Sequence, residues 1–457
     1  MPSYVDFCDR KRADVAKVGL ADVPALHPSL FPFQRDIVEW ALRLGRAAIF
    51  ADCGMGKTRM QLEWAYHVPG RVLILAPLAV GAQTIAEARA MGYGEAVVSQ
   101  CRDGESKARV VVTNYERLHY FTPGDFTGVV LDESSILKSY MGKTKRRIIE
   151  AFSGHRWRLC CTATPAPNDY LELGNHAEFL GVLDSHEMIA RWFLPDTSTF
   201  GVYRLKRHGI QSYWQWVSSW SACIGKPSDL GYEDGDFVLP ALEIKRSIVD
   251  VDIVDGAGDQ LFRSTSLNAT QVHKEKRRTA PLRAARVAEL VLNEPTEQWL
   301  IWCETNYEAD ALRAVLPRAV EIRGSDSDEL KSSSLLGFAN GEIQTLITKA
   351  KIAGFGMNWQ VCARMVFVGP TFSYEQFYQA VRRCWRFGQL RTVDCHVVMA
   401  STEIEIFGVM NRKAESHEEM KSAMFASARA AIRQDSLARD YTPRHRAPLP
   451  SFLRSVL

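Results

Sequence analysis

The residues with the clearest chemical potential form the segment Ala51-Asp-Cys-Gly-Met-Gly-Lys-Thr58. An apolar run over 47–50 precedes it and an amphipathic stretch over 59–67 follows, which predicts a strand, a glycine-containing turn and a helix. Glycines let backbone N–H groups approach phosphate oxygens, and a helix N-terminus favours negative charge. The segment therefore predicts a nucleotide phosphate loop, in which Lys57 reaches the terminal phosphates and the Thr58 hydroxyl ligates Mg²⁺. The residues expected to contact the nucleotide here are Cys53, Gly54, Met55, Gly56, Lys57 and Thr58.

A second copy of the string Met-Gly-Lys-Thr occurs at 141–144. It follows the polar pair Ser139-Tyr140 instead of a strand, and Leu137 stands where the first glycine of a phosphate loop belongs. This copy predicts a solvent-exposed basic turn.

Two adjacent carboxylates follow the apolar run 129–131. A strand that delivers Asp132 and Glu133 at its carboxyl end supplies what nucleotide hydrolysis needs beside a phosphate loop. Asp132 is expected to hold Mg²⁺, and Glu133 to act as the general base on the attacking water.

A pair of arginines offers the complementary positive charge. Arg383 and Arg386 are three residues apart in a predicted helix and therefore share one face. Supplied across a cleft, they would stabilise the transferring phosphoryl group. The alternative is a solvated basic face, because Arg382 and Arg391 belong to the same cluster.

Short apolar runs that alternate with longer amphipathic stretches must position these groups. The expected strands are 47–50, 72–75, 110–113, 129–131 and 159–161, then 299–303, 320–322, 345–348, 365–368 and 395–399. This alternation is typical of the α/β class with mostly parallel sheets flanked by helices, here in two lobes with a nucleotide cleft between them. The expected segments are an N-terminal lobe over 1–184, a short helical insertion or bridge over 185–242, a C-terminal lobe over 243–411, and a basic helical tail over 412–457.

Composition sets wider limits. The 457 residues are 46% hydrophobic and 24% charged, which excludes a fibrous or disordered chain. The net charge of +3 is too small to indicate a nucleic-acid partner by itself. The sequence contains no run of 18 apolar residues, so it predicts no membrane span. The ten cysteines show neither C-x-x-C pairs nor zinc spacing, so we expect reduced thiols in a cytoplasmic protein.

Further segments carry a family resemblance, in the correct order along the chain. They are Ser29–Gln34, Leu75–Leu78, Thr113–Glu116, Cys161–Asn168, Leu300–Trp302, Arg323–Ser325, Lys349–Asn358, Gln379–Gln389 and Thr402–Glu405. With the phosphate loop and the acidic pair, this set resembles the motifs of the Swi/Snf-type translocases of helicase superfamily two, in a compact bacterial or bacteriophage form.

The resemblance implies two RecA-like lobes and ATP-driven movement along double-stranded DNA without obligatory strand separation, with ATP and Mg²⁺ as cofactors. It also leaves room for a protein partner that sets the biological role, in a bacterial or infected host cell. It adds Gln34 and Gly356 to the nucleotide site. The DNA contacts that it implies are Pro77, Thr113, Asn114, Thr305, Gly324, Ser325, Lys351 and Asn358. The residues that it implies couple the sites are Ser135, Thr162, Thr164 and Gln379.

Several alternatives stay open. Ser135 stands where the family usually has histidine, which keeps a nucleotide-gated clamp with weak ATPase activity in view. A strand-separating DNA or RNA helicase is the other alternative, although no hairpin signal is placed to split a duplex. The basic run over 138–147 lies beside the nucleic acid or forms a solvated helix face. Trp214, Trp216 and Trp220 are expected to form a small core in preference to a base-stacking surface.

Overall fold

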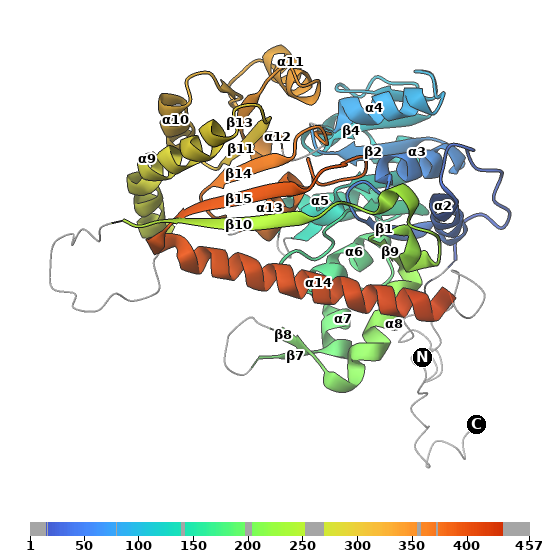
Figure 1. The fold of residues 1–457 in the computed structure, drawn as a ribbon. Coiled ribbons are helices and arrows are strands. Elements are labelled where there is room, and N and C mark those ends of the chain that lie inside the picture. The colour runs from blue at the N-terminus through green and yellow to red at the C-terminus, as the bar shows by residue number, and fades with distance from the viewer. Residues whose placement is uncertain are drawn as a thin grey trace, which may run out of the picture.

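The computed structural model describes Val15 and residues 17–78, 80–138, 142–196, 203–251, 269–353, 358–371 and 373–432. Within these residues the chain forms two parallel sheets flanked by helices, one in each lobe (Figure 1). This arrangement confirms the α/β class and the two lobes. The described part of the chain contains no helix that combines the length and the apolar composition needed to cross a membrane.

The first sheet is built from the N-terminal half of the chain. Its strand order is β3 (Val98–Gln100), β4 (Val110–Asn114), β2 (Val72–Ala76), β5 (Gly128–Asp132), β6 (Trp157–Cys161), β1 (Arg46–Ala51) and β9 (Ser221–Ile224). The helices of this half are α2 (Pro32–Leu44), α3 (Lys57–His67), α4 (Gly81–Ala90), α5 (Lys143–Phe152), α6 (Glu172–Leu180), α7 (Ser185–Trp192) and α8 (Ile210–Trp220).

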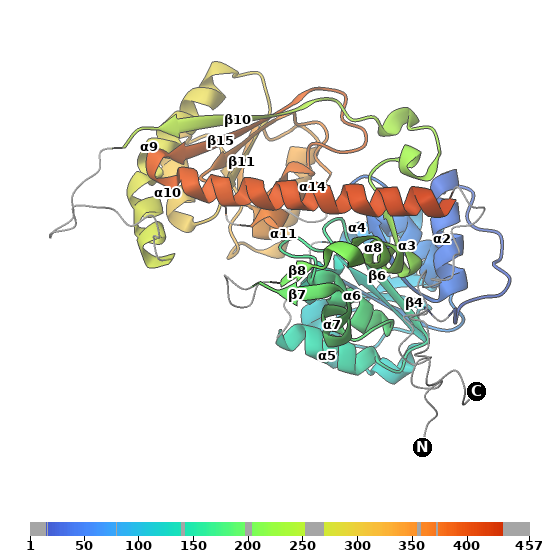
Figure 2. The same cartoon turned by 90° about the horizontal axis from the view of Figure 1, so that it is seen from below.

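The second sheet has the order β10 (Leu242–Val249), β15 (Val393–Ala400), β14 (Arg364–Val368), β11 (Trp299–Cys303), β13 (Thr345–Lys349) and β12 (Val320–Glu321). Its helices are α9 (Ala269–Asn293), α10 (Asn306–Val315), α11 (Asp328–Ala339), α12 (Ala350–Ala353), α13 (Tyr374–Val381) and α14 (Ile404–Ile432). The last of these leaves the second lobe and runs across the first, as two perpendicular views show (Figures 1 and 2).

The central strands of each sheet are buried on both faces, as expected for parallel sheets covered by helices, whereas the edge strand β10 is largely exposed. In β2, Leu73 and Leu75 face one apolar core while Val72 and Ile74 face another. The strands therefore read as continuous apolar runs, and all ten expected strands are present.

The segment expected to be a helical bridge contains more than helices. β9 comes from it and pairs with β1, so it forms an edge of the first sheet. β7 (Phe193–Pro195) and β8 (Tyr203–Leu205) form an antiparallel pair that the sequence did not reveal. Strands of three residues are too short for alternation to reveal them. The boundaries at 184, 242 and 411 stay predictions.

The tryptophans of this segment are core residues, as expected. Trp216 and Trp220 are fully buried, Trp214 is nearly so, and all three belong to one apolar cluster of the first lobe.

Candidate functional site: a nucleotide pocket between the lobes

The two lobes enclose a pocket of about 1290 Å³. The first lobe contributes the phosphate loop and both carboxylates, and the second lobe contributes the arginine pair. The lining residues are Phe31, Gln34, Cys53, Gly54, Gly56, Lys57, Thr58, Arg59, Val80, Gln83, Glu87, Asp132, Glu133, Phe237, Asn358, Gln360, Arg383, Arg386 and Phe387. The fold thus brings together groups that lie more than 300 residues apart in the sequence.

The phosphate loop connects β1 to α3 and requires its glycines. Gly54 and Gly56 have φ angles of 92° and 80°, which side chains rarely allow. A Cβ atom on Gly56 would lie 2.3 Å from Nε2 of Gln34, and one on Gly54 would lie 3.0 Å from the backbone nitrogen of Phe387. Lys57 Nζ donates to the carbonyl oxygen of Ala51 at 2.8 Å. The lysine is therefore held over its own loop.

Gln34 is buried and fixed at the start of α2. Its Oε1 accepts from the backbone N–H of Phe31 at 3.0 Å, and its Nε2 donates to the carbonyl oxygen of Met55 at 2.9 Å. The predicted base-reading glutamine therefore also ties α2 to the phosphate loop.

Three aromatic rings beside Gln34 were not expected from the sequence. Phe237 lies 5.1 Å from Phe31 and 4.7 Å from Phe387 between ring centroids. The rings come from the start of the first lobe, from the segment between the sheets and from the second lobe. They can hold a flat base by stacking. An isolated phenylalanine carries no sequence signal for this role.

Asp132 and Glu133 end β5, as predicted, and both lie in the pocket. Asp132 Oδ1 accepts from Gln61 Nε2 at 2.7 Å and from the backbone N–H of Glu133 at 3.1 Å. Glu133 has a φ of 53°, in the left-handed region that a side chain seldom adopts. Such strain is characteristic of functional positions.

Burial raises the pKa of both carboxyls. For Asp132 the hydrogen bond from Gln61 opposes the rise. For Glu133 the charge of Lys57 opposes the rise, whereas the charge of Asp132 adds to it. A carboxylate whose pKa is raised above its ordinary value is a stronger base, so it is better suited to accept a proton from water.

The Glu133 carboxylate is held from both lobes. Thr162 Oγ1 donates to its Oε2 at 3.1 Å, and Gln379 Nε2 from α13 donates to the same oxygen at 3.4 Å. The Thr162 hydroxyl in turn accepts from the backbone N–H of Thr164 at 3.1 Å. Ser135 is buried nearby in the 3₁₀ turn Ser134–Lys138. The hydrogen bond from Gln379 connects Glu133 to α13 without involving Ser135.

The predicted arginine pair follows α13 and faces the first lobe. Because α13 ends at Val381, the two arginines lie in the turns after the helix, which corrects the expectation that they share one helix face. Arg383 Nη2 donates to Gln379 Oε1 at 3.1 Å, and its Nε donates to the carbonyl oxygen of Gln379 at 2.9 Å. Gln379 therefore touches both Arg383 and Glu133. Burial and the neighbouring Arg383 lower the pKa of Arg386 to about 10. Arg386 still carries its charge at neutral pH.

The donors present fit Mg²⁺. The Thr58 hydroxyl and the Asp132 carboxylate are hard oxygen ligands on one pocket wall, and Asp132 receives both of its hydrogen bonds at Oδ1. The described residues contain no cluster of three or more His, Cys, Asp or Glu side chains for a metal. Protein sites commonly hold Mg²⁺ through one or two side-chain oxygens together with substrate phosphates, and Thr58 and Asp132 can supply those oxygens.

The predicted DNA contacts fall in several places. Pro77, Thr113 and Asn114 line one small pocket at the ends of β2 and β4, beside Arg102 and Arg117. Thr113 Oγ1 and Asn114 Oδ1 are buried there without a hydrogen-bond partner among the described residues.

The second-lobe candidates are mostly exposed. Gly324 and Ser325 form a turn before α11, and Lys351 lies on α12. The Thr305 hydroxyl caps α10 by accepting from the backbone N–H of Glu308, so it has a structural task of its own. Asn358 lines the candidate nucleotide pocket, and its contact with DNA stays a prediction. Gly356 lies outside the described residues.

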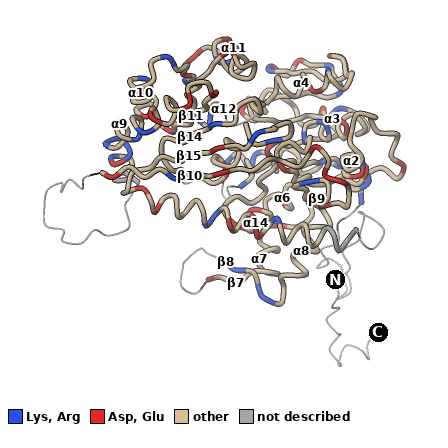
Figure 3. Tube along the Cα trace, viewed as in Figure 1, with Lys and Arg blue, Asp and Glu red and all other residues tan. Residues whose placement is uncertain are grey.

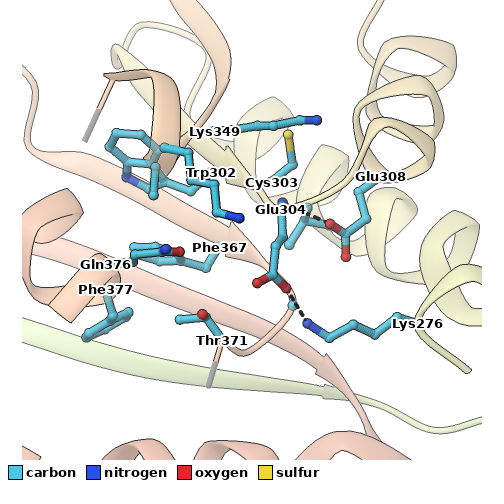
Figure 4. A pocket seen from close by; sticks show the side chains of 14 residues that line it. Lys276, Trp302, Cys303, Glu304, Glu308, Lys349, Phe367, Thr371, Gln376 and Phe377 are labelled. Carbon is cyan, nitrogen blue, oxygen red and sulfur yellow. Dashed lines mark hydrogen bonds and ion pairs between the residues drawn. The ribbon is translucent and has the colours of Figure 1, made fainter. Parts of the chain in front are cut away.

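A further pocket of about 470 Å³ lies at the carboxyl ends of β11, β13 and β14 (Figure 4). Trp302, Phe367 and Phe377 form an apolar wall, while Lys349 and Lys351 lie around it. Lys276 Nζ forms an ion pair with Glu304 Oε2 at 2.7 Å. Lys349 adds positive charge to the pocket beside Lys351.

Glu133→Gln is expected to lower the rate of ATP hydrolysis by about 10²–10⁴-fold, because the amide cannot accept the proton of the attacking water. The same change should raise the melting temperature in Mg²⁺-free buffer near about pH 8, since each unit of raised pKa corresponds to about 1.4 kcal/mol of lost stability. A carboxyl with a raised folded pKa destabilises the fold above that pKa, and this cost disappears as pH falls through it. The gain should therefore vanish near about pH 4.

Thermal unfolding of Glu133→Gln at both pH values checks this prediction, and Glu150→Gln on the exposed side of α5 is the control. Lower stability than wild type at the higher pH would contradict it.

Three comparisons with known proteins each found a match. Residues 283–388 match the helicase conserved C-terminal domain. Protein p41 of Acyrthosiphon pisum secondary endosymbiont phage 1 is 30% identical, over 82% of this chain and 93% of its own length. The solved structure of the Sulfolobus solfataricus SWI2/SNF2 ATPase core in complex with dsDNA is similar, with 15% identity, a TM-score of 0.42, and coverage of 91% of this chain and 99% of that one.

The chain belongs to the same family as the phage protein, and its residues 283–388 match the helicase conserved C-terminal domain. The helicase domain and the site together indicate an ATP-dependent nucleic-acid motor.

Proposed function

We propose that the chain hydrolyses ATP with Mg²⁺ in the pocket between the lobes and uses the energy to move along double-stranded DNA without obligatory strand separation. The observation that carries this proposal is the meeting of Lys57, Glu133 and Arg386 in one pocket whose two walls belong to different lobes. Hydrolysis then requires the lobes to close, and product release lets them part.

The chain's residues divide the chemical task. The phosphate loop and Lys57 bind the phosphates. Thr58 and Asp132 would hold Mg²⁺, which would shield the negative charge of the phosphates. Glu133 accepts the proton of the attacking water. Arg383 and Arg386 stabilise the charge that develops on the transferred group, and the three phenylalanines hold the base.

The DNA path is proposed to run over the predicted contacts of both lobes. Pro77 precedes α4 and the Gly324–Ser325 turn precedes α11, and these two helices lie near one another in both views (Figures 1 and 2). Basic and acidic residues alternate along the trace of both lobes in this view (Figure 3). Contacts through backbone groups, hydroxyls and a few local cations read phosphate and not sequence.

The hairpin β7–β8 is the one feature that favours a strand-separating helicase, because such enzymes need a wedge. It lies on the opposite side of the molecule from α4 and α11 (Figure 1). A wedge would have to stand on the DNA path. The arrangement therefore supports the translocase over the helicase.

Duplex DNA is expected to stimulate ATP hydrolysis and to permit displacement of a third strand from a triplex, whereas unwinding of a tailed duplex should be poor. Parallel assays with duplex DNA, single-stranded DNA and RNA check this. Stimulation by RNA alone, or efficient unwinding, would support the helicase instead.

The path is tested by Arg117→Ala, beside Thr113 and Asn114. Affinity for duplex DNA should fall equally for all sequences, and the slope of log affinity against log salt should decrease by about one. Arg286→Ala is the control, because this exposed arginine of α9 pairs with Glu289. Equal effects of the two variants would contradict the proposed path.

A further inference from the structure

The C-terminal helix α14 is anchored in both lobes. Its first turns place Phe407 and Met410 in an apolar core of the second lobe. Further along, Met420 and Met424 enter a core of the first lobe, where the helix packs against α8, β9 and the turn 227–230. The helix therefore spans the boundary that closes around the nucleotide (Figure 2).

A buried polar cluster joins this helix to the phosphate loop. Asp52, the second residue of the loop, pairs through Oδ2 with Arg382 Nη2 at 2.6 Å. Lys421 Nζ of α14 donates to both carboxylate oxygens of Asp52, at 2.9 and 3.1 Å. The Tyr378 hydroxyl of α13 donates to Asp52 Oδ1 and accepts from Lys421 at 3.3 Å. We call Asp52, Tyr378, Arg382 and Lys421 the Asp52 cluster.

The members of the Asp52 cluster are each less than 10% exposed. Burial by itself would raise the pKa of Asp52, but Lys421 and Arg382 outweigh it and hold that pKa well below its usual range. Two cations thus surround one carboxylate in a setting where an unpaired charge is costly. The cluster is stable only while the loop, α13 and α14 stay together.

The cluster borders the catalytic groups directly. Arg382 is adjacent to Arg383, whose side chain is bonded to Gln379 and through it connected to Glu133. The guanidinium of Arg382 also lies 4.6 Å from the ring centroid of Trp385, the residue before Arg386. Holding Arg382 against the loop therefore fixes where both arginines enter the pocket.

We propose that Lys421 is a positioning residue for ATP hydrolysis, which acts through the Asp52 cluster to hold the end of α13 against the phosphate loop. This inference rests on the proposed ATPase activity and extends the working site to a helix beyond the last recognised motif. It assigns to α14 the task of keeping the lobes in the arrangement that hydrolyses ATP.

The test compares Lys421→Met, Asp52→Asn and the double variant in the full chain. Lys421→Met should lower kcat by about tenfold to a hundredfold, as expected for misplaced catalytic groups, with nucleotide Kd nearly unchanged. Asp52→Asn leaves two buried cations together and should be the most damaging. Adding Lys421→Met to Asp52→Asn should raise kcat above that of Asp52→Asn alone, up to the level of Lys421→Met, because it removes one of those cations. Such a rescue distinguishes charge coupling from a loss of packing.

Arg412→Met is the matched control, since this exposed cation of α14 lies outside the Asp52 cluster. Small-angle X-ray scattering supplies a readout independent of hydrolysis, and the radius of gyration should rise in Lys421→Met but not in Arg412→Met. Wild-type kcat and an unchanged radius in Lys421→Met would overturn the proposal, as would a lowered melting temperature with normal kcat per folded molecule. If wild type itself fails to hydrolyse ATP, the proposed function falls, and the scattering result still decides whether Lys421 holds the lobes together.

Discussion

Lys57→Ala is expected to abolish ATP hydrolysis, with a loss of at least about a hundredfold to a thousandfold, while the protein stays folded. One preorganised donor aimed at developing negative charge contributes about that much. Lys57 makes its hydrogen bond to the Ala51 carbonyl of its own loop, so its loss removes charge from the pocket and little from the core. Steady-state ATP hydrolysis and thermal unfolding of the variant check both halves of the prediction.

The chain carries its own matched control for this experiment. Lys143 stands in the same four-residue string, but it lies exposed at the start of α5 and does not line the nucleotide pocket. Lys143→Ala should hydrolyse ATP as wild type does in the absence of DNA. Comparable losses in the two variants, or near-normal turnover of Lys57→Ala, would mean that the nucleotide is bound elsewhere.

Arg386→Ala should lower kcat by about 10³–10⁵-fold, the contribution of an arginine that neutralises a phosphoryl transition state. Nucleotide affinity should change far less, because the arginine reaches from the second lobe and acts when the lobes are closed. Single-turnover hydrolysis and equilibrium binding of a fluorescent ATP analogue separate the two quantities.

Arg391→Ala provides the comparison within the same basic cluster. Arg391 lies at the surface and pairs with Glu297 at 2.9 Å, outside the pocket. Its removal should leave turnover unchanged. A loss of affinity equal to the loss of kcat in Arg386→Ala would show that this arginine binds the ground state and would contradict the proposed role.

Local pattern was enough to predict the strands and the chemistry at their ends. Most of the expected strands are predominantly apolar, because both faces of a covered parallel sheet are buried. A phosphate loop is likewise a local structure, since glycine conformations and a helix start follow from consecutive residues. Lys57, Asp132 and Glu133 could therefore be placed from the sequence together with the elements that carry them.

Elements with weak local signals were missed. β9 contributes four residues to the edge of the first sheet, and β7 and β8 contribute three each to the hairpin. Their pairing depends on where the rest of the chain places them, because runs so short do not establish a period.

Partners across the lobes could only be decided by the tertiary structure. The sequence predicts that Arg383 faces a phosphate, but not that Gln379 joins it to Glu133 in place of a route through Ser135. It marks Asn358 as part of a motif without revealing that this residue lines the nucleotide pocket.

The base-holding phenylalanines and the Asp52 cluster depend on the same kind of contact. The contact between Phe237 and Phe387 depends on how the two lobes pack together. The ion pair between Asp52 and Lys421 depends on the position of α14 against the first lobe. Such contacts join residues that lie far apart in the chain. The type of each residue alone does not indicate which partner it contacts. The sequence by itself therefore determined which groups are proposed to do the chemistry, because their motifs are local, and the packing of the two lobes decided what holds those groups in place.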